Sequence, residues 1–205
     1  MSNPGTPALL RAALAVYDPD GRVLQNTLRF QINPESLTRT IQPQGVGGES
    51  GDRLETLRFK GPPIETIKFE AKFDVAQMVG DPEYPYAAKY GLHPLLAAFE
   101  TLVYPSSADL QQQNTLAGLG TLEIAPMRAP LILFAWGPNR VVPVRITDMS
   151  IAEKEFDASL NPVLVDSMSL TLRVLSVNDL DFGSGPASFF SAYQHQKEIF
   201  AKLVQ

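Results

Sequence analysis

The stretch Ile67-Lys68-Phe69-Glu70-Ala71-Lys72-Phe73-Asp74-Val75 alternates strictly between apolar and charged side chains. Every second residue is apolar, and the residues between carry charges of both signs. A period of two is typical of a strand with one face in the core and one face in water, as in an antiparallel sheet. The stretch therefore predicts a fold dominated by β-strands.

Towards the amino terminus, a strand is predicted over Leu9 to Tyr17. Asp18-Pro19-Asp20-Gly21 reads as a turn, because Pro presets φ and Gly accepts a left-handed conformation. The next strand would place three apolar residues on one face (Leu28, Phe30 and Ile32), so the two strands form a hairpin. Asn33-Pro34 ends this strand, and Ser36 to Ile41 resumes an extended pattern. The following residues predict a glycine-rich loop (45–52) and a short strand (57–59).

The period changes after this half of the chain. Leu92 to Val103 has helical spacing, with His93-Pro94 at its start and Tyr104-Pro105 at its end. Ser106 to Asn114 is predicted to be a polar loop. Further strands are expected over Leu131 to Trp136, Val141 to Thr147 and Asp166 to Leu175. An amphipathic helix is expected from about Ala187.

These elements predict six to eight strands, a helix in the middle and a helix at the end. The fold class is mainly β with α (α+β), as an antiparallel barrel or sandwich with one flanking helix and a C-terminal helix. A parallel nucleotide-binding sheet is disfavoured, because strands and helices do not alternate. We expect one β domain over residues 1–182 and a helical docking segment over residues 183–205.

The composition excludes several classes of function. The net charge of −5 and the lack of a Lys/Arg run give no reason to expect a nucleic acid as partner. No apolar run is long enough to cross a bilayer and no signal peptide is recognised, so no membrane insertion is expected. The absence of cysteine removes disulfides and thiolate sites, and it fits assembly in a reducing cytoplasm.

No set of catalytic or metal-binding residues emerges from the pattern. His93 and His195 are the only histidines, and each is interpreted as a helix-end or solvated residue. The glycines of 45–48 lack the spacing and the lysine of a phosphate-binding loop. Glu153, Glu155 and Asp157 are expected on one exposed face. We therefore predict no enzyme activity, no cofactor and no metal site.

The decapeptide Phe30-Gln31-Ile32-Asn33-Pro34-Glu35-Ser36-Leu37-Thr38-Arg39 has two interpretations. One is structural, because Pro lacks the donor that a strand needs and Asn forms local turns. The other comes from its order of an apolar strand, Asn33-Pro34, Leu37 and Arg39. That order resembles the opening motif of the tube-like baseplate proteins of contractile injection systems, the phage-tail-like particles of bacteria.

Three later segments are similar to the same family in the same order. They are Gly91 to Leu96, which resembles the family's helix start; Phe134-Ala135-Trp136-Gly137, which resembles its strand end; and Ile151 to Asp157 with Leu160-Asn161-Pro162, which resembles the approach to its last strand. The resemblance thus extends from about Leu9 to Leu175. Phe30, Asn33, Pro34, Leu37, Arg39, Trp136 and Gly137 are the residues that carry it.

The resemblance implies a tail-tube fold repeated around a hexameric ring. Such rings adapt the spike hub to the inner tube at the baseplate, and they catalyse no reaction. The expected partners are further copies of the chain, the spike hub protein, the inner tube protein and baseplate wedge components. The particle would be assembled in the bacterial cytoplasm.

Many members of that family carry a LysM module after the tube domain, and these 205 residues include none. We expect the terminal helix to provide the contacts that such a module would make. Its candidate docking residues are Phe189, Tyr193 and Phe200.

Two alternatives to the adaptor remain. One is an inner-tube protomer or another phage tail structural protein, which would polymerise into stacks, whereas an adaptor stops at one ring. The other is an unrelated β-sandwich ligand-binding module. For that module Trp136 is the aromatic residue to test, although a Trp at a strand end is expected to pack on the core.

Overall fold

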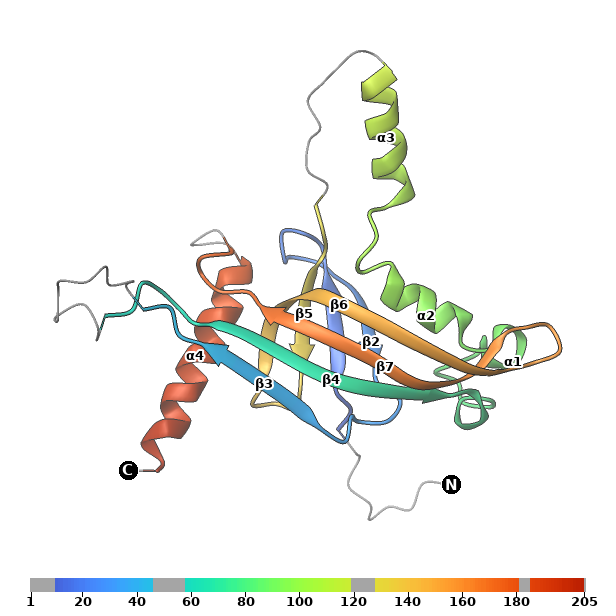
Figure 1. Cartoon of the computed structure of the whole chain (residues 1–205), viewed down its shortest axis with the longest axis horizontal. Coiled ribbons are helices and arrows are strands. Elements are labelled where there is room, and N and C mark those ends of the chain that lie inside the picture. Colours follow the sequence, from blue (N-terminus) through green and yellow to red (C-terminus); the bar gives the residue numbers. More distant parts are fainter. Residues whose placement is uncertain (1–9, 46–57, 119–127, 181–184, 205) are drawn as a thin grey trace.

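The computed structural model describes residues 10–45, 58–118, 128–180 and 185–204 (Figure 1). The strands in these ranges are β1 Ala13–Tyr17, β2 Leu24–Arg29, β3 Leu37–Gln42, β4 Ile64–Asp74, β5 Leu131–Ala135, β6 Val141–Phe156 and β7 Pro162–Val174. The helices there are α1 Ala87–Tyr90, α2 His93–Glu100, α3 Ser107–Gly118, α4 Gly185–Lys202 and the short 3-10 helix η2 Val75–Gln77.

All seven strands belong to one antiparallel sheet with the order β2-β1-β5-β6-β7-β4-β3. The predicted class, mainly β with α, is therefore confirmed. The predicted hairpin of the first two strands also forms. Gly21 has a φ of +69° in its turn, and Asp18 accepts hydrogen bonds from the backbone N–H groups of Arg22 and Val23.

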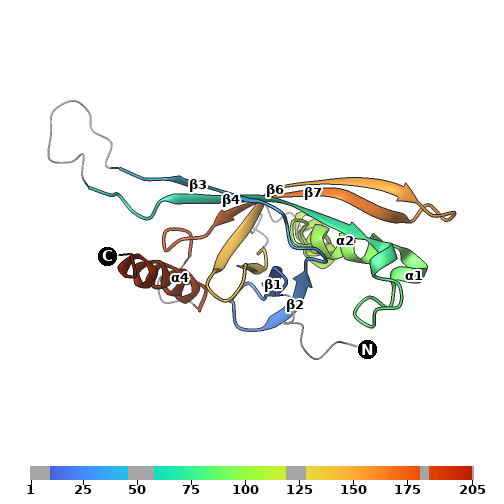
Figure 2. The same cartoon turned by 90° about the horizontal axis from the view of Figure 1, so that it is seen from below.

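The sheet folds into two layers because β6 takes part in both. The first residues of β6 pair with β5, and the rest of this 16-residue strand pairs with β7 as far as Phe156. Its ladder with β7 is irregular between Ile146 and Asp148 and again between Ala152 and Glu153. Such irregularities bend a strand and increase its twist. Figure 2 shows β3, β4, β6 and β7 edge-on as one layer, with β1 and β2 below it.

The core lies between these layers. On β4, the predicted alternation holds, with Ile67, Phe69, Ala71 and Phe73 all at most 3% exposed. The neighbouring β7 contributes Met168, Leu170 and Leu172, which have no exposed surface. Burying one large apolar side chain stabilises a fold by about 1.5 to 3 kcal/mol. This two-layer core is therefore the main source of stability.

The predicted barrel does not close. Within the described residues, β2 pairs only with β1, and β3 pairs only with β4. The sheet is thus an open, folded sheet with β2 and β3 at its edges, closer to the predicted sandwich than to a barrel.

Helix α2 covers the core beside the β6–β7 hairpin, with Leu95, Leu96 and Phe99 buried. Gly91, just before it, has a φ of +58°, and a Cβ there would lie 2.5 Å from the carbonyl oxygen of Pro162. The N–H of Leu92 donates to that same oxygen at 2.9 Å. Only glycine therefore allows the chain to approach the start of β7 so closely.

Some predicted strand limits are wrong. Leu10 is 69% exposed and precedes β1, and Ile32 is 42% exposed because β2 already ends at Arg29. Val75 begins η2, since the Asp74 side chain accepts from the N–H of Ala76 and caps that turn. The strand predicted to end at Thr147 continues to Phe156.

The polar loop predicted over Ser106 to Asn114 is also wrong, because α3 occupies Ser107–Gly118. The Ser106 hydroxyl accepts from the N–H of Asp109 and donates to its carboxylate, which caps the helix start. None of the α3 side chains is buried. Figure 1 shows α3 projecting from the sheet. The chain between β4 and β5 therefore holds α1, α2 and α3 rather than one flanking helix.

Three predictions fall on the gaps between the described ranges. Most of the glycine-rich loop and the start of the short strand lie there, although Phe59 forms an isolated bridge with Gly45. The predicted domain boundary at residues 182 and 183 lies there too.

Candidate functional site

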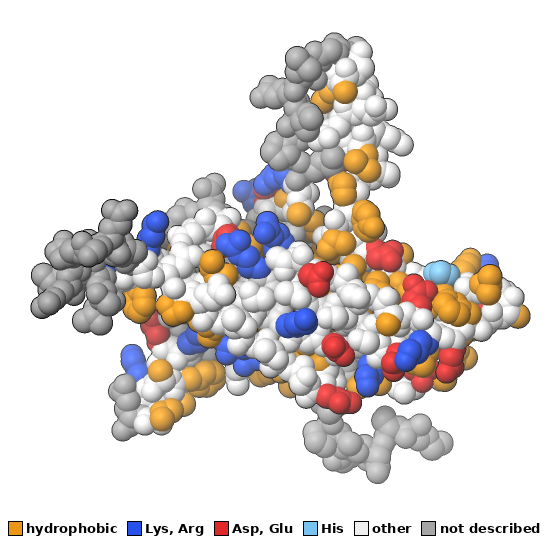
Figure 3. All heavy atoms as spheres, in the orientation of Figure 1, with side chains coloured by type: hydrophobic (Ala, Val, Ile, Leu, Met, Phe, Trp, Pro, Cys, Tyr) orange, Lys and Arg blue, Asp and Glu red, His pale blue; other side chains and the backbone are white. Residues whose placement is uncertain are grey.

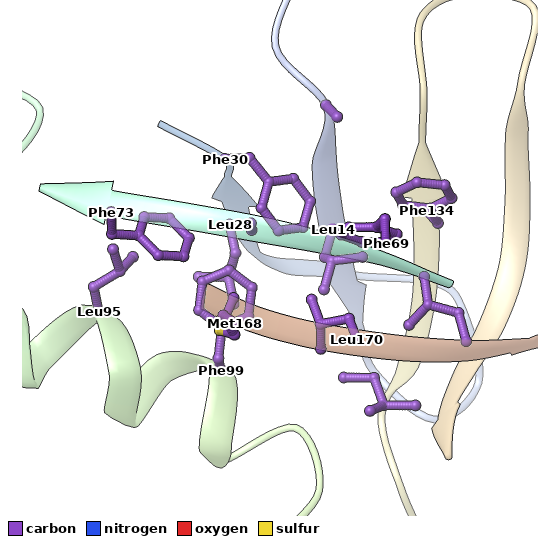
Figure 4. Packing of buried hydrophobic residues seen from close by; sticks show 14 of the residues in the cluster. Leu14, Leu28, Phe30, Phe69, Phe73, Leu95, Phe99, Phe134, Met168 and Leu170 are labelled. Atoms are coloured by element: carbon purple, nitrogen blue, oxygen red, sulfur yellow. The ribbon is translucent and has the colours of Figure 1, made fainter. Parts of the chain in front are cut away.

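The first residue of the motif, Phe30, lies in the centre of the core (Figure 4). Its ring packs edge-on against Phe69 at a centroid distance of 5.3 Å. It also contacts Phe99 at 5.8 Å and Phe73 at 6.4 Å. Phe30 has no exposed surface, so its role in this structure is packing.

After β2 ends at Arg29, the side-chain amides of Gln31 and Asn33 form hydrogen bonds with the backbone of other segments. Gln31 bonds to both the N–H and the carbonyl of Asp74, at 2.7 and 2.9 Å. Asn33 accepts from the N–H of Ala12 and donates to the carbonyl of Leu10, both at 2.8 Å. These four bonds tie the chain after β2 to the start of β1 and the end of β4. The motif is therefore a structural junction.

The remaining motif residues also support the fold. Pro34 is buried and Leu37 is half-buried against the core. Trp136 packs on Phe134 and Phe69, at 5.8 and 6.2 Å, as predicted for a Trp at a strand end. Gly137 follows with a φ of +74° in the turn between β5 and β6. Trp136 is thus a core residue here and does not form an aromatic binding surface.

Arg39 belongs to a polar group that sequence reasoning did not find. Glu65 on β4 is only 3% exposed, and its Oε1 lies 2.6 Å from Nη2 of Arg39 on β3. Its other oxygen, Oε2, lies 3.0 Å from Nζ of Lys197 on α4. The Tyr193 hydroxyl donates to Oε1 at 3.0 Å and accepts from Arg39 at 3.1 Å. We call Arg39, Glu65, Tyr193 and Lys197 the Glu65 cluster.

The cluster holds its groups in fixed protonation states. Burial alone would raise the pKa of Glu65, but its hydrogen bonds and attraction to Lys197 and Arg39 bring the pKa below its usual value. Burial, together with the charge of Glu65, raises the pKa of Tyr193 to about 12. The carboxylate is therefore ionised and the phenol neutral at pH 7. This pattern fastens α4 to the sheet.

A sequence signal for Glu65 exists. It occupies the apolar phase of the alternation, two residues before Ile67. A charge in that phase predicts a buried, paired carboxylate.

The three predicted docking residues of α4 do not share one surface. Tyr193 is 5% exposed and faces the core, and Phe189 is half-buried with its ring 6.1 Å from that of Tyr17. Phe200 is 40% exposed. Its exposed neighbours at the carboxyl end of α4 are Ile199, Leu203 and Val204. Any docking through α4 would thus use this end, which we call the α4 end.

The outer face of the β4–β7–β6 layer is polar. Lys68, Glu70 and Lys72 are exposed on β4, and Ser167 on β7 donates to Glu70 at 3.2 Å. Lys154 on β6 pairs with Asp166 on β7 at 2.6 Å. Figure 3 shows this face, with positive and negative side chains scattered over uncharged polar surface.

Depressions on the described surface are open. One of them, of about 560 Å³, lies between the end of α2 and β6 and is lined by three carboxylates (Glu100, Asp148 and Glu153) among mostly apolar side chains. Among the described residues, no group of three or more His, Cys, Asp or Glu is placed to hold a metal ion. No described helix is both long and apolar enough to cross a membrane.

In the part of the chain that the structure describes, the two edge strands of the sheet, β2 and β3, each have one side without a strand partner. β3 presents a straight edge of six residues with Ile41 48% exposed, and β2 presents Leu24, 52% exposed. An edge strand carries a row of backbone N–H and carbonyl groups that can pair with another chain. A comparison with models of known protein families finds no match to this chain, and one with curated protein sequences finds none either.

Proposed function

We propose that this chain is a structural ring subunit of a contractile injection system, which adapts the spike hub to the inner tube at the baseplate. The observation that carries the proposal is the open sheet, in which β2 and β3 each lack a strand partner on one side within the described residues. The ordered resemblance of the four sequence motifs supports it. The particle would be assembled in the bacterial cytoplasm.

The geometry favours a repeated, head-to-tail contact between edges. If β2 of one copy pairs with β3 of the next, every copy uses the same two edges. The copies then form a closed ring when the rotation from one copy to the next is a whole fraction of 360°. Six copies would complete the hexameric ring that the resemblance implies. Pairing satisfies the free backbone groups of both edges and covers Leu24 and Ile41.

The polar outer face supports a structural role as well. Its side chains pair with one another across the strands, as Lys154 does with Asp166 and Ser167 does with Glu70. A face of this kind can line a water-filled lumen or meet a polar neighbour. In the family that the chain resembles, the spike hub, the inner tube and the baseplate wedge are the neighbours.

Lysine substitutions at the edges test the proposal. In Leu24→Lys and Ile41→Lys, a charge replaces an exposed apolar side chain on β2 or β3, which discourages edge pairing without disturbing the core. We expect the isolated protein to be monomeric or heterogeneous, and the wild-type chain to form rings on a trimeric spike hub. Either variant should form no rings, as judged by light scattering and electron microscopy of the mixture with the hub.

Tyr104→Lys is the matched control, because Tyr104 is 69% exposed and lies between α2 and α3, outside both edge strands. It should assemble like the wild type. A wild-type monomer that never binds a hub or tube protein would refute the adaptor role. It would also reopen the alternative of an unrelated binding module.

A further inference from the structure

Two exposed segments of this chain have the same pattern with opposite charge. Glu155-Phe156-Asp157 ends β6 and Arg58-Phe59-Lys60 precedes β4. All six residues are exposed, with Phe156 at 52% and Phe59 at 77%. We call residues 153–157 the acidic tip, because Glu153 is exposed beside them, and residues 58–60 the basic segment.

The acidic tip and the basic segment lie at opposite ends of the molecule. The tip is where β6 meets β7, at the pair Phe156 and Pro162. The basic segment extends beyond the other end of β4, where Phe59 bridges to Gly45 past the last pair of β3 and β4. In Figures 1 and 2 the β6–β7 hairpin projects from one end, and the teal segment leading into β4 extends from the other.

The adjoining sheet carries charges of both signs at each end. Near the basic end, Arg145 on β6 lies directly opposite Arg173 on β7, and Lys68 on β4 is exposed close by. Arg173 already pairs with Asp179 at 2.7 Å, whereas Arg145 and Lys68 form no ion pair within the described residues. The acidic end instead carries Glu70 and Asp166 in addition to the tip. Lys72 and Lys154 are exposed at that end too, and Lys154 pairs with Asp166, so the difference in charge between the two ends rests on the acidic tip and the basic segment.

The acidic tip is held in one conformation. Asp157 accepts from the N–H groups of Ser159 and Asn161, at 2.7 and 2.9 Å, and also from the Asn161 amide at 2.8 Å. Its own N–H donates to the carbonyl of Asn161 at 3.0 Å. A loop fixed in this way loses little conformational entropy when a partner binds.

We propose that the acidic tip of one copy binds the basic segment of a second copy, so that copies associate end to end. The occupant is a second copy because one chain carries both complementary surfaces, each with an exposed phenylalanine between like charges. Burial of the two rings supplies apolar contact, and the opposite charges fix the orientation.

The contact deepens the proposed function and rests on it only in taking copies of this chain as partners. The end contact joins copies along the direction of the strands, whereas edge pairing joins copies side by side, perpendicular to the strands. Edge pairing would close a ring, and end contacts would stack one ring on the next. Stacked rings are the product expected of an inner-tube protomer, the second candidate, so measured stacking would replace the adaptor by that protomer and keep the role of a structural ring subunit.

Two charge reversals test this inference. The tip variant is Glu153→Lys with Glu155→Lys, and the segment variant is Arg58→Glu with Lys60→Glu. None of these side chains forms an ion pair or hydrogen bond within the described residues. In each variant alone, the tip of one copy meets a segment of the same charge on the next copy. We therefore expect its self-association constant, measured by sedimentation at low salt, to fall about tenfold or more.

Mixing the two variants should restore association, because the native tip of the segment variant meets the native segment of the tip variant. The matched control is Glu35→Lys with Glu198→Lys, which changes the net charge by the same amount as the tip variant, at side chains that are 89% and 59% exposed. This control should associate like the wild type. Circular dichroism and melting curves should show all the variants folded. If the tip variant melts early, the segment variant carries the test.

Three results would overturn the inference: a wild type that stays monomeric at every concentration, a control that loses as much affinity as the variants, or a mixture that does not recover. These results are distinct from failure of the proposed function. Without the end contact, ring formation on the hub would persist. Conversely, the end contact would remain measurable in solution if no hub or tube protein bound.

Discussion

At the scale of single residues, Glu65 shows how this fold tolerates a charge in its core. Its carboxylate lies on the buried face of β4, yet Arg39, Tyr193 and Lys197 reach it from another strand and a helix. Removing a partner from such a group leaves the others desolvated and unpaired, which costs more than the pair itself contributes. One side chain therefore couples three elements that are distant in the sequence.

Glu65→Gln tests this coupling. The amide keeps the shape of the carboxylate but not its charge, so Arg39 and Lys197 lose their counter-ion. Because both are partly exposed, at 28% and 35%, we expect the free energy of unfolding at pH 7 to fall by about 2 kcal/mol rather than the larger cost of a fully buried pair. Urea denaturation of the two proteins measures the difference.

The difference should depend on pH in one direction. The folded-state pKa of Glu65 is below its usual value of 4.5, so its stabilisation is complete above that value and is lost as the pH falls through the lowered pKa. The wild type and Glu65→Gln should therefore approach one another in stability as the pH falls below 4.5 and through the lowered pKa. Glu70→Gln, the same change at an exposed site of β4, should cost less than about 0.5 kcal/mol. Equal losses in both variants would contradict the coupling.

The motif residues give a different result at this scale. A strand stop at Asn33-Pro34 follows from the chemistry of those two residues, and the sequence predicts it correctly to within a few positions. Which backbone groups the Gln31 and Asn33 amides bind could not be predicted, because Asp74 and Leu10 are distant in the sequence. Arg39 could be selected only by resemblance, whereas Glu65 could be inferred from its place in the alternation.

At the scale of elements, α4 is part of the core as well as a candidate docking surface. Ala187 and Tyr193 are buried, and Phe190 packs against the same cluster as the sheet. Deleting residues 187–205 would remove these contacts and leave Glu65 with Arg39 alone. Such a deletion would confuse loss of folding with loss of docking.

A narrower change separates these two roles of α4. Phe200→Ser with Leu203→Ser alters only the exposed α4 end, so stability should change by less than about 0.5 kcal/mol, while incorporation into the baseplate should fall if this end docks there. Thermal melting and the yield of assembled particles measure the two effects. Gln194→Ala, at an exposed position nearer the start of α4, is the control and should assemble normally. Normal assembly of the double serine variant would contradict docking through the α4 end.

The sequence predicted elements well where one face is buried. The alternation along β4 and the helical spacing of α2 both reflect a continuous core, and both elements form. The spacing of apolar residues failed to predict elements whose side chains are not buried in the core. α3 has no buried side chain, so its only signal was the Ser106 and Asp109 cap, and the end of β6 is exposed on both faces beyond Ala152. The sheet order, and hence the position of the free edges, depends on pairings that no local pattern contains.

At the scale of the whole molecule, the two proposed contacts differ in physical origin. Edge pairing relies on backbone hydrogen bonds and on apolar side chains such as Leu24 and Ile41. End contact relies on the opposite charges of the acidic tip and the basic segment, with two phenylalanines between them. Dissolved salt screens exposed charges and leaves backbone pairing largely unaffected. Salt should therefore separate the two contacts.

We expect stacks and rings to respond differently as sodium chloride increases. The screening length falls from about 10 Å at 0.1 M to about 3 Å at 1 M, so the acidic tip and the basic segment lose most of their attraction over this range. Light scattering should show stacks dissociating, while electron microscopy should show rings persisting on the hub. The tip variant, which lacks the charge attraction from the start, should show rings without stacks at every salt concentration. If rings and stacks dissociated together in the wild type, a single contact would account for both, and the division of this molecule into edges that close a ring and ends that stack it would be wrong.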